Sequence, residues 1–355
     1  MFFLWRVSLV LAALVVMGCS EEPKNILPTI PVSEKADPAL ALNEIAKSVK
    51  RIQLETTKAA LLGYIMKVKQ YNEKLYIADR DKVLVFDLEG KFLYQIGSYG
   101  EGPGEYMIVN TFAMDPHNGN VYIASNYRIL VYSADAELLM EKKFFHYIYG
   151  LEFTDGKLYE FYNSHGNEVK EGYVNYSFLH EFSPQLELLD SITLKTVNLK
   201  KHIVSVYNYK HFISKTKEGT YLYYPVLVAE NIKRDTLYQF KEDRLVPFLK
   251  LDFEKPQSSD VLKMRKAVNI YNINNSNSYV ICEYVQEREN RFFVFNKKDS
   301  ISYNLKVGPL DDQGEPVVLR PLDLEKDKFY YAKASEFMDK ETEESNPIVG
   351  IVELK

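Results

Sequence analysis

The chain alternates between tight polar turns and short apolar runs rich in Tyr and Phe, and this pattern recurs six times. Apolar runs of this kind, bounded by Asn, Asp, Gly or Lys, are typical of β-strands. An anchor position within each run can be placed at residues 76, 122, 159, 222, 280 and 330, so that successive anchors are 46, 37, 63, 58 and 50 residues apart. This spacing indicates an internal repeat with insertions of varying length.

Each anchor strand is followed by a second strand, a turn and a further strand, as in residues 83–86, 87–90 and 91–96. The sixth copy, at residues 348–354, reaches the chain end without its last strand. The strand at residues 49–54 precedes the first repeat and has no unit of its own, so we expect it to complete the sixth. We therefore predict an all-β fold over residues 49–355: a six-bladed β-propeller of four-stranded antiparallel blades, with its ring closed by an N-terminal strand.

The first two units carry a more specific motif, in residues 85–92, 96–106, 121–124 and 128–132. These segments resemble the NHL repeat of propeller proteins. In overall plan the chain resembles the six-bladed propeller lipoproteins of the bacterial outer membrane and cell surface. That family has no single activity, so the resemblance implies a fold and leaves the function to be argued from the site.

The first 18 residues have the form of an export signal, with Arg6 as the positive flank, an apolar core at residues 7–17 and the small residue Gly18. The core of 11 residues is too short to cross a membrane as a helix. Residues 16–19 resemble the lipobox of bacterial lipoproteins, which implies cleavage before Cys19 and attachment of lipid to it. An ordinary secretory signal followed by a chance cysteine is the alternative.

Residues 20–22, Ser-Glu-Glu, resemble an acidic tag that directs lipoproteins to the outer face of the outer membrane. This predicts an outer-membrane protein anchored by lipid and exposed at the surface, with the periplasmic face as the alternative. Residues 19–48 contain four prolines and little apolar periodicity. We expect them to form a semi-extended tether between the membrane and the propeller.

Composition narrows the functional classes. A net charge of −5 over 355 residues gives no reason to expect a nucleic-acid partner. The six His residues form no HExxH or His-x-His motif, and no Gly-x-Ser-x-Gly segment is present. We therefore assign no catalytic residue, metal ligand or cofactor from motifs. Cys282 lies in an apolar run and is predicted to be a buried, inert thiol.

The predicted insertions fall on one face of the propeller, where loops between the second and third strands and the crossings between blades meet. Polar residues on that face are candidates for binding a glycan or a surface protein, because Tyr rings can stack on sugars while Arg and Asp form hydrogen bonds. The candidates are Asp79, Arg80, Asn126, Tyr127, Arg128, His165 and Arg288. A basic segment at residues 195–217 offers a further site for an acidic partner.

Two functions follow from this sequence. The first, which we favour over an enzyme, is a lipid-anchored binding module. The alternative is a metal-dependent hydrolase or lyase with calcium in the central channel, as in propeller lactonases. A ring of inward Asp, Glu or Asn side chains within reach of a metal would favour the enzyme, and a Tyr-lined or apolar channel would favour the binding module.

Overall fold

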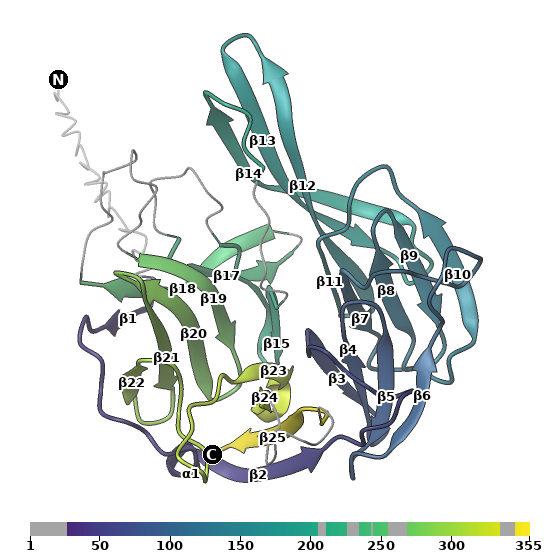
Figure 1. Ribbon diagram of the computed structural model, residues 1–355. Coiled ribbons are helices and arrows are strands. Elements are labelled where there is room, and N and C mark those ends of the chain that lie inside the picture. Colours follow the sequence, from purple (N-terminus) through teal and green to yellow (C-terminus); the bar gives the residue numbers. More distant parts are fainter. Residues whose placement is uncertain (1–26, 205–210, 226–233, 243, 255–267, 334–344) are drawn as a thin grey trace, which may run out of the picture.

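The computed structural model describes residues 27–204, 211–225, 234–242, 244–254, 268–333 and 345–355. The described part of the chain is all-β and contains six sheets with four antiparallel strands each, one of which is extended by a parallel strand (Figure 1). Within the described residues, helical structure is limited to α1 (Leu42–Ile45) and η2 (Leu324–Lys326). The predicted all-β class and the six four-stranded antiparallel sheets are confirmed.

Sheets 1 to 5 each take four strands that are consecutive along the chain. Sheet 1 contains β3 (Lys67–Tyr71), β4 (Lys74–Ala78), β5 (Val83–Asp87) and β6 (Phe92–Ile96). Sheet 2 contains β7 (Thr111–Met114), β8 (Val121–Ser125), β9 (Arg128–Tyr132) and β10 (Leu138–Lys143). Sheet 3 contains β11 (Gly150–Thr154), β12 (Lys157–Val169), β13 (Gly172–Phe182) and β14 (Leu188–Leu199).

Sheet 4 contains β15 (Ile213–Thr216), β16 (Gly219–Leu222), β17 (Thr236–Lys241) and β18 (Arg244–Phe253). Sheet 5 contains β19 (Val268–Asn275), β20 (Tyr279–Gln286), β21 (Glu289–Asn296) and β22 (Ser302–Leu305). Sheet 6 joins the two ends of the chain, because β23 (Arg320–Asp323), β24 (Lys328–Lys333) and β25 (Ile348–Leu354) are completed by β2 (Ala46–Gln53). The expected N-terminal strand is thus the fourth strand of the last sheet, and it begins three residues before the predicted position.

The six anchor positions all lie on the second strand of their sheets: β4, β8, β12, β16, β20 and β24. Tyr76 and Tyr122 are fully buried, and their hydroxyls donate to the carbonyls of Ala134 and Pro184 in the next sheet, at 3.2 Å in both cases. The ring of Tyr159 packs against Phe240 of sheet 4. The aromatic anchors therefore join neighbouring sheets, which explains why Tyr recurs at these positions.

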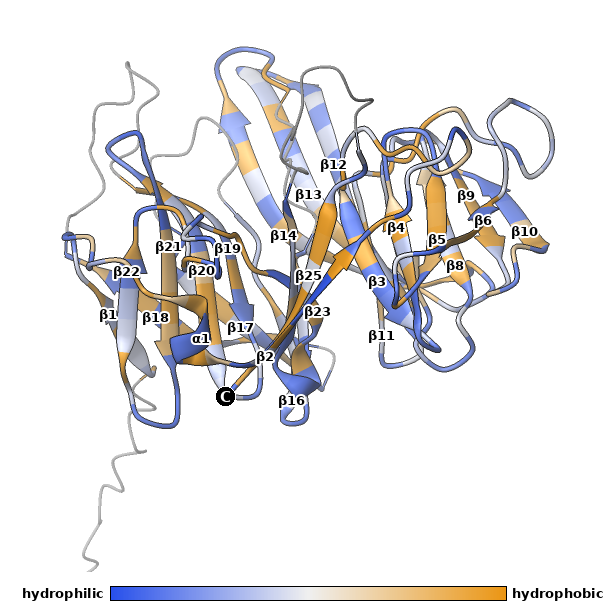
Figure 2. Ribbon diagram, turned by 60° about the horizontal axis from the view of Figure 1, so that its bottom comes forward, coloured by the Kyte–Doolittle hydropathy of each residue, from blue (hydrophilic) through white to orange (hydrophobic). Residues whose placement is uncertain are grey.

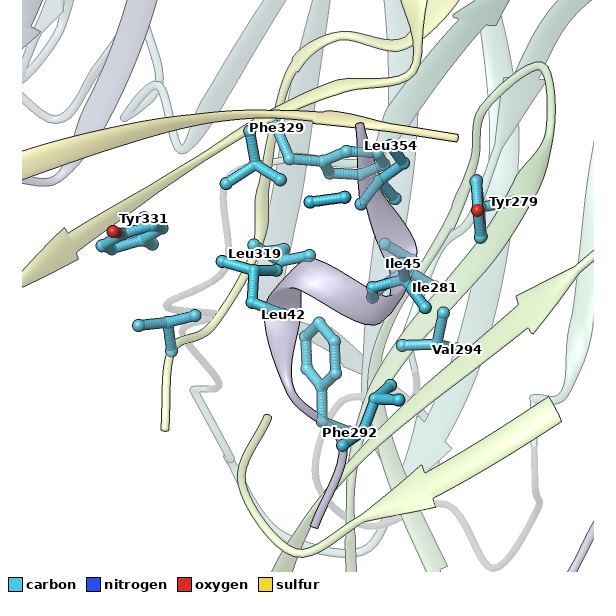
Figure 3. Packing of buried hydrophobic residues seen from close by; sticks show 14 of the residues in the cluster. Leu42, Ile45, Tyr279, Ile281, Phe292, Val294, Leu319, Phe329, Tyr331 and Leu354 are labelled. Atoms are coloured by element: carbon cyan, nitrogen blue, oxygen red, sulfur yellow. The ribbon is translucent and has the colours of Figure 1, made fainter. Parts of the chain in front are cut away.

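Six hydrophobic clusters each join two sheets that are consecutive in the chain, and the last of them joins sheet 6 to sheet 1. In that cluster Tyr330 and Val349 pack with Leu75 and Ile77. Figure 3 shows the cluster between sheets 5 and 6, where α1 also contributes side chains. Figure 2 shows the corresponding pattern, with hydrophobic strand centres and hydrophilic turns. The sheets consequently pack in a closed cycle, and burial between sheets provides most of the core.

The chain is folded against the sheets from Thr29 onward, which differs from the tether expected over residues 19–48. β1 (Thr29–Val32) pairs in parallel with β18 and makes a fifth strand at the edge of sheet 4. Ile30 and Val32 are buried there, while Leu42 and Ile45 are buried between sheets 5 and 6. These apolar side chains gain burial on the domain, which an extended tether would not provide. The signal segment and Cys19 lie outside the described residues.

Sheet 3 is longer than the others and projects from the body of the protein (Figure 1). Residues 163–172 belong to this hairpin rather than to a loop insertion, because β12 continues to Val169 and β13 begins at Gly172. The pairing extends to Val169 opposite Gly172. At about 3.3 Å per residue, a strand of 13 residues is roughly 43 Å long.

Candidate functional site

Four aromatic residues form a continuous line at one end of sheets 2 and 3, and we refer to Tyr127, Tyr147, Tyr149 and His165 as the aromatic strip. Tyr127 contacts Tyr147 edge to face with 6.1 Å between ring centroids. Tyr147 and Tyr149 are 4.9 Å apart, and Tyr149 meets the ring of His165 edge to face at 6.3 Å. Tyr127 is 54% exposed, and the other three are half-buried. The strip therefore presents aromatic surface to solvent.

The turn between β8 and β9 holds the first member of the strip. Asn126 adopts a left-handed conformation with φ of 53°, which Asn tolerates better than most residues, and this places Tyr127 at the tip. The connector between β10 and β11 lies along the same turn. Its Phe144 amide donates to the carbonyl of Tyr127 at 2.7 Å, and its Ile148 amide donates to that of Asn126 at 3.0 Å.

Successive side chains of the β10–β11 connector point alternately into the protein and toward solvent. Ile148 is fully buried between sheets 2 and 3, so its neighbours Tyr147 and Tyr149 face the opposite way. The hydroxyl of Tyr147 donates to Oδ1 of Asn110 at 2.7 Å, and Nδ2 of the same Asn donates to the carbonyl of Ile148 at 3.1 Å. Asn110 is buried and fixes both the connector and the phenol. The strip is thus held in place before any ligand binds.

Burial raises the pKa of both Tyr147 and Tyr149, and the neighbouring phenols raise it further. Both phenols therefore keep their protons in the physiological range, and the Tyr147 hydroxyl donates its proton to Asn110. Close by in the sequence, the side chain of Phe145 is fully exposed. A line of aromatic faces with hydroxyl groups at their edges matches a ligand that has apolar ring faces and polar substituents.

Of the predicted candidates, Asn126, Tyr127 and His165 come together at this strip. Arg128 is adjacent in sequence, but its guanidinium is engaged by the Glu141 carboxylate and the Glu105 carbonyl, each at 2.8 Å. It serves to hold the β6–β7 connector against β9.

Asp79 is 5% exposed, and its carboxylate accepts hydrogen bonds from the amides of Gly63 at 2.8 Å and Arg80 at 2.6 Å. It organises a turn in sheet 1. The Arg80 side chain is exposed, and its backbone carbonyl accepts from Val109. Arg288 is exposed in the β20–β21 turn of sheet 5, which is separated from sheet 3 by sheet 4 in the cycle. These residues do not contribute to the strip.

The sequence reasoning missed Tyr147, Tyr149 and Asn110. The run Tyr147-Ile148-Tyr149 does carry a signal, because strict alternation across a buried Ile places both tyrosines on one side. The basic segment at residues 195–217 is described except for residues 205–210. In the described part of this segment, the Lys215 ammonium donates to the Asp155 carboxylate at 2.5 Å.

The innermost strands carry a charged network. The Lys67 ammonium is 1% exposed and donates to the Glu152 carboxylate at 2.9 Å and to the carbonyl of Leu151 at 3.0 Å. Lys69 binds the other oxygen of the same carboxylate. Burial alone would raise the pKa of Glu152, but the two lysines outweigh it and lower the pKa. Three inner side chains from sheets 1 and 3 therefore form one ionised group.

A second part of this network lies at sheets 4, 5 and 6. Arg320 of β23 forms an ion pair with Glu283, whose carboxylate also accepts from Asn272 of β19 at 2.8 Å. His211 is buried, and burial together with the positive charges of Lys67, Lys69 and Arg320 lowers its pKa well below the ordinary value, so its imidazole is neutral. These inner carboxylates are bound to Lys or Arg.

Among the described residues, one group combines His, Cys, Asp or Glu side chains at distances that suit a metal ion. It consists of His146, Glu160 and His180, and it joins the β10–β11 connector to sheet 3 rather than lining the innermost strands. Within the described part of the chain, no helix is long and apolar enough to span a membrane.

The likeness to one solved structure supports the fold. A solved structure from Bacteroides fragilis NCTC 9343, described as a "putative exported protein", matches with a TM-score of 0.66 and 18% identity, over 92% of this chain and 99% of that one. A protein of unknown function from Bacteroides caccae matches with a TM-score of 0.37 and 12% identity, over 83% of this chain and 86% of that one. No curated protein matches significantly. A family model described as "Domain of unknown function (DUF4934)" matches residues 27–353, and the chain therefore belongs to this family.

Proposed function

We propose that this protein is a six-bladed β-propeller, anchored by lipid to the outer membrane and exposed at the cell surface, that binds a glycan through the aromatic strip. The cyclic packing of six four-stranded sheets supports the propeller, as does the completion of sheet 6 by β2. The NHL-like segments in sheets 1 and 2 agree with it. The export signal, the lipobox-like residues before Cys19 and the acidic residues after it support the location.

The aromatic strip is the observation that carries the binding function. Tyr and His rings stack on the apolar faces of sugar rings, and their polar edges bond sugar hydroxyls. The hydrogen bonds of Asn110 and of the two backbone amides hold the strip in place, which reduces the entropy cost of binding. The inner network is ion-paired and does not suggest a reaction, so binding is the function that the site supports best.

The test of binding uses the chain purified in detergent and a panel of neutral and anionic polysaccharides, with affinity measured by isothermal titration calorimetry. Tyr127→Ala and Tyr149→Ala should each weaken binding about fivefold or more, because each removes one stacking face worth about 1 kcal/mol or more. Tyr99→Ala is the matched control, since Tyr99 is 64% exposed and lies in the β6–β7 connector outside the strip. The proposal is refuted if no polysaccharide binds, or if the strip variants bind like Tyr99→Ala.

The anchor has a separate test. Cys19→Ala should move the protein from the membrane fraction to the soluble fraction and abolish incorporation of labelled palmitate. Retention of Cys19→Ala in the membrane fraction would contradict the lipid anchor and leave the binding experiment unaffected.

A further inference from the structure

A second cluster lies beside the aromatic strip and contains three residues that are far apart in the sequence. His146 comes from the same connector as Tyr147, Glu160 lies on β12 and His180 lies on β13 directly opposite Glu160. Nε2 of His146 is 2.6 Å from Oε1 of Glu160, and Nδ1 of His180 is 3.1 Å from Oε2. One ligand atom from each residue lies within 4.8 Å of the other two. The carboxylate is therefore held between two imidazoles.

The carboxylate of Glu160 is placed where an ionised group needs a compensating charge. Its side chain is completely buried, whereas those of His146 and His180 retain 19% and 15% exposure. Within the described residues, each oxygen of the carboxylate has one imidazole nitrogen as its hydrogen-bond partner. Burial of a carboxylate is costly unless a cation balances it. A metal ion between the three side chains would supply that charge.

The surroundings of the cluster are aromatic and hold the imidazoles in place. The Tyr162 ring lies 4.0 Å from the ring of His146 and 5.5 Å from that of His180, measured between centroids. Phe144 and Phe178 pack against the same imidazoles at 5.8 and 5.9 Å. This shell lowers the local dielectric and strengthens electrostatic interactions inside it. Access remains from the side on which the two His side chains are exposed.

We propose that Nε2 of His146, the carboxylate of Glu160 and Nδ1 of His180 bind a divalent zinc ion, with a fourth position open to solvent. Two imidazoles and one carboxylate are a common zinc ligand set, and tetrahedral coordination at about 2.1 Å places ligand atoms about 3.4 Å apart. The nitrogen–oxygen pairs of 2.6 and 3.1 Å need to separate by less than 1 Å to reach this spacing. Each imidazole would then offer a lone pair where it now donates a proton.

The ion would tie the β10–β11 connector to sheet 3. His146 is the residue before Tyr147, so its coordination fixes the segment that carries two members of the aromatic strip. This consequence rests on the proposed function, whereas the zinc site itself does not. A loss of zinc should therefore loosen the strip without removing its rings.

The experiment measures zinc directly on the full chain purified in detergent. After dialysis against chelator, inductively coupled plasma mass spectrometry and titration with ZnCl₂ should give one equivalent of zinc per chain. The variants His146→Asn, Glu160→Gln and His180→Asn should each weaken zinc binding at least tenfold. His117→Asn is the matched control, because His117 is exposed in the turn between β7 and β8, away from the cluster.

Thermal unfolding provides a second readout. At free zinc 100-fold above its Kd, the wild-type Tm should rise by about 4 °C, from ligand linkage and an unfolding entropy typical of a domain of this size. Glu160→Gln can hydrogen-bond both imidazoles and should fold without zinc, yet show no rise. The proposal is overturned if the wild type binds no zinc, or if Glu160→Gln and His180→Asn bind it as tightly as His117→Asn. Glycan affinity of Tyr127→Ala does not enter this test, so the two proposals can fail independently.

Discussion

Replacement of Glu152 by Gln tests the charged network on the innermost strands. Lys67 is 1% exposed and pairs with Glu152, and Lys69 shares the same carboxylate. Glu152→Gln keeps an oxygen acceptor but leaves two ammonium groups without their counter-charge. Breaking a buried ion pair costs about 3–5 kcal/mol, and the retained acceptor places the expected loss near the lower end, at about 3 kcal/mol.

The assay is thermal and urea unfolding followed by circular dichroism. With an unfolding entropy of about 2.1 cal/mol/K per residue, a loss of about 3 kcal/mol lowers the Tm by roughly 4 °C in a domain of this size. Glu89→Gln is the control, because Glu89 pairs with Lys50 on the surface, where its side chain is 82% exposed. It should change stability by no more than about 0.5 kcal/mol.

The same pair of proteins gives a pH dependence with a defined sign. Lys67 and Lys69 lower the pKa of Glu152 in the folded state against the effect of burial. The ionised carboxylate therefore stabilises the fold above the ordinary Glu pKa of about 4.3, and this contribution is lost as the pH falls through the lower pKa of the folded state. The Tm difference between wild type and Glu152→Gln should be full at pH 7 and shrink below about pH 4. If Glu152→Gln unfolds like Glu89→Gln at pH 7, the reasoning about the inner network is refuted.

Two further predictions concern the closure of the cycle and the turns that support it. Ile52→Ala should cost about 2–4 kcal/mol in urea unfolding, because Ile52 is 2% exposed between sheets 6 and 1, whereas Val49→Ala on the same strand, 41% exposed, should cost less than 1 kcal/mol; equal losses would argue against burial at this interface. Gly90→Ala should lower the Tm clearly more than Gly156→Ala. Both glycines have positive φ, so the backbone strain of the substitution is shared. A Cβ at Gly90 would lie 2.0 Å from the Gln53 carbonyl oxygen, whereas a Cβ at Gly156 would meet nothing within 4 Å. Similar Tm values for the two Gly variants would show that the β2 backbone yields to the added methyl group.

The strands could be predicted from the sequence because their signal is local. A polar turn followed by Tyr76 or Tyr122 within an apolar run is sufficient to place the second strand of a sheet. The partner of β2 followed from counting strands, since the last unit lacked one. The folded segment from Thr29 could not be predicted in this way, because Ile30 and Val32 are a short alternation whose burial depends on the edge of sheet 4.

Some residues of the candidate sites could likewise be predicted from local sequence, and others could not. Asn126 and Tyr127 were predicted because a two-residue turn between strands is visible in the sequence. The pairing of Glu160 with His180 was not, because it depends on the register of a long hairpin with a bulge between Ser164 and Asn167. The approach of His146 depends on packing between sheets 2 and 3, which no local pattern encodes.

The completion of sheet 6 by both ends of the chain has a consequence for folding. β25 lies between β2 and β24, so β2 has no strand partner and one edge of β24 stays unpaired until residues 348–354 are available. The pairing of Val49 with Val352 joins residues about 300 positions apart, and contacts of such long range form late. A chain that ends a few residues early would leave two strand edges open, and such edges promote aggregation. The pairing of sheet 6 thus depends on residues 348–354, and a product that lacks them is distinguishable by its exposed strand edges.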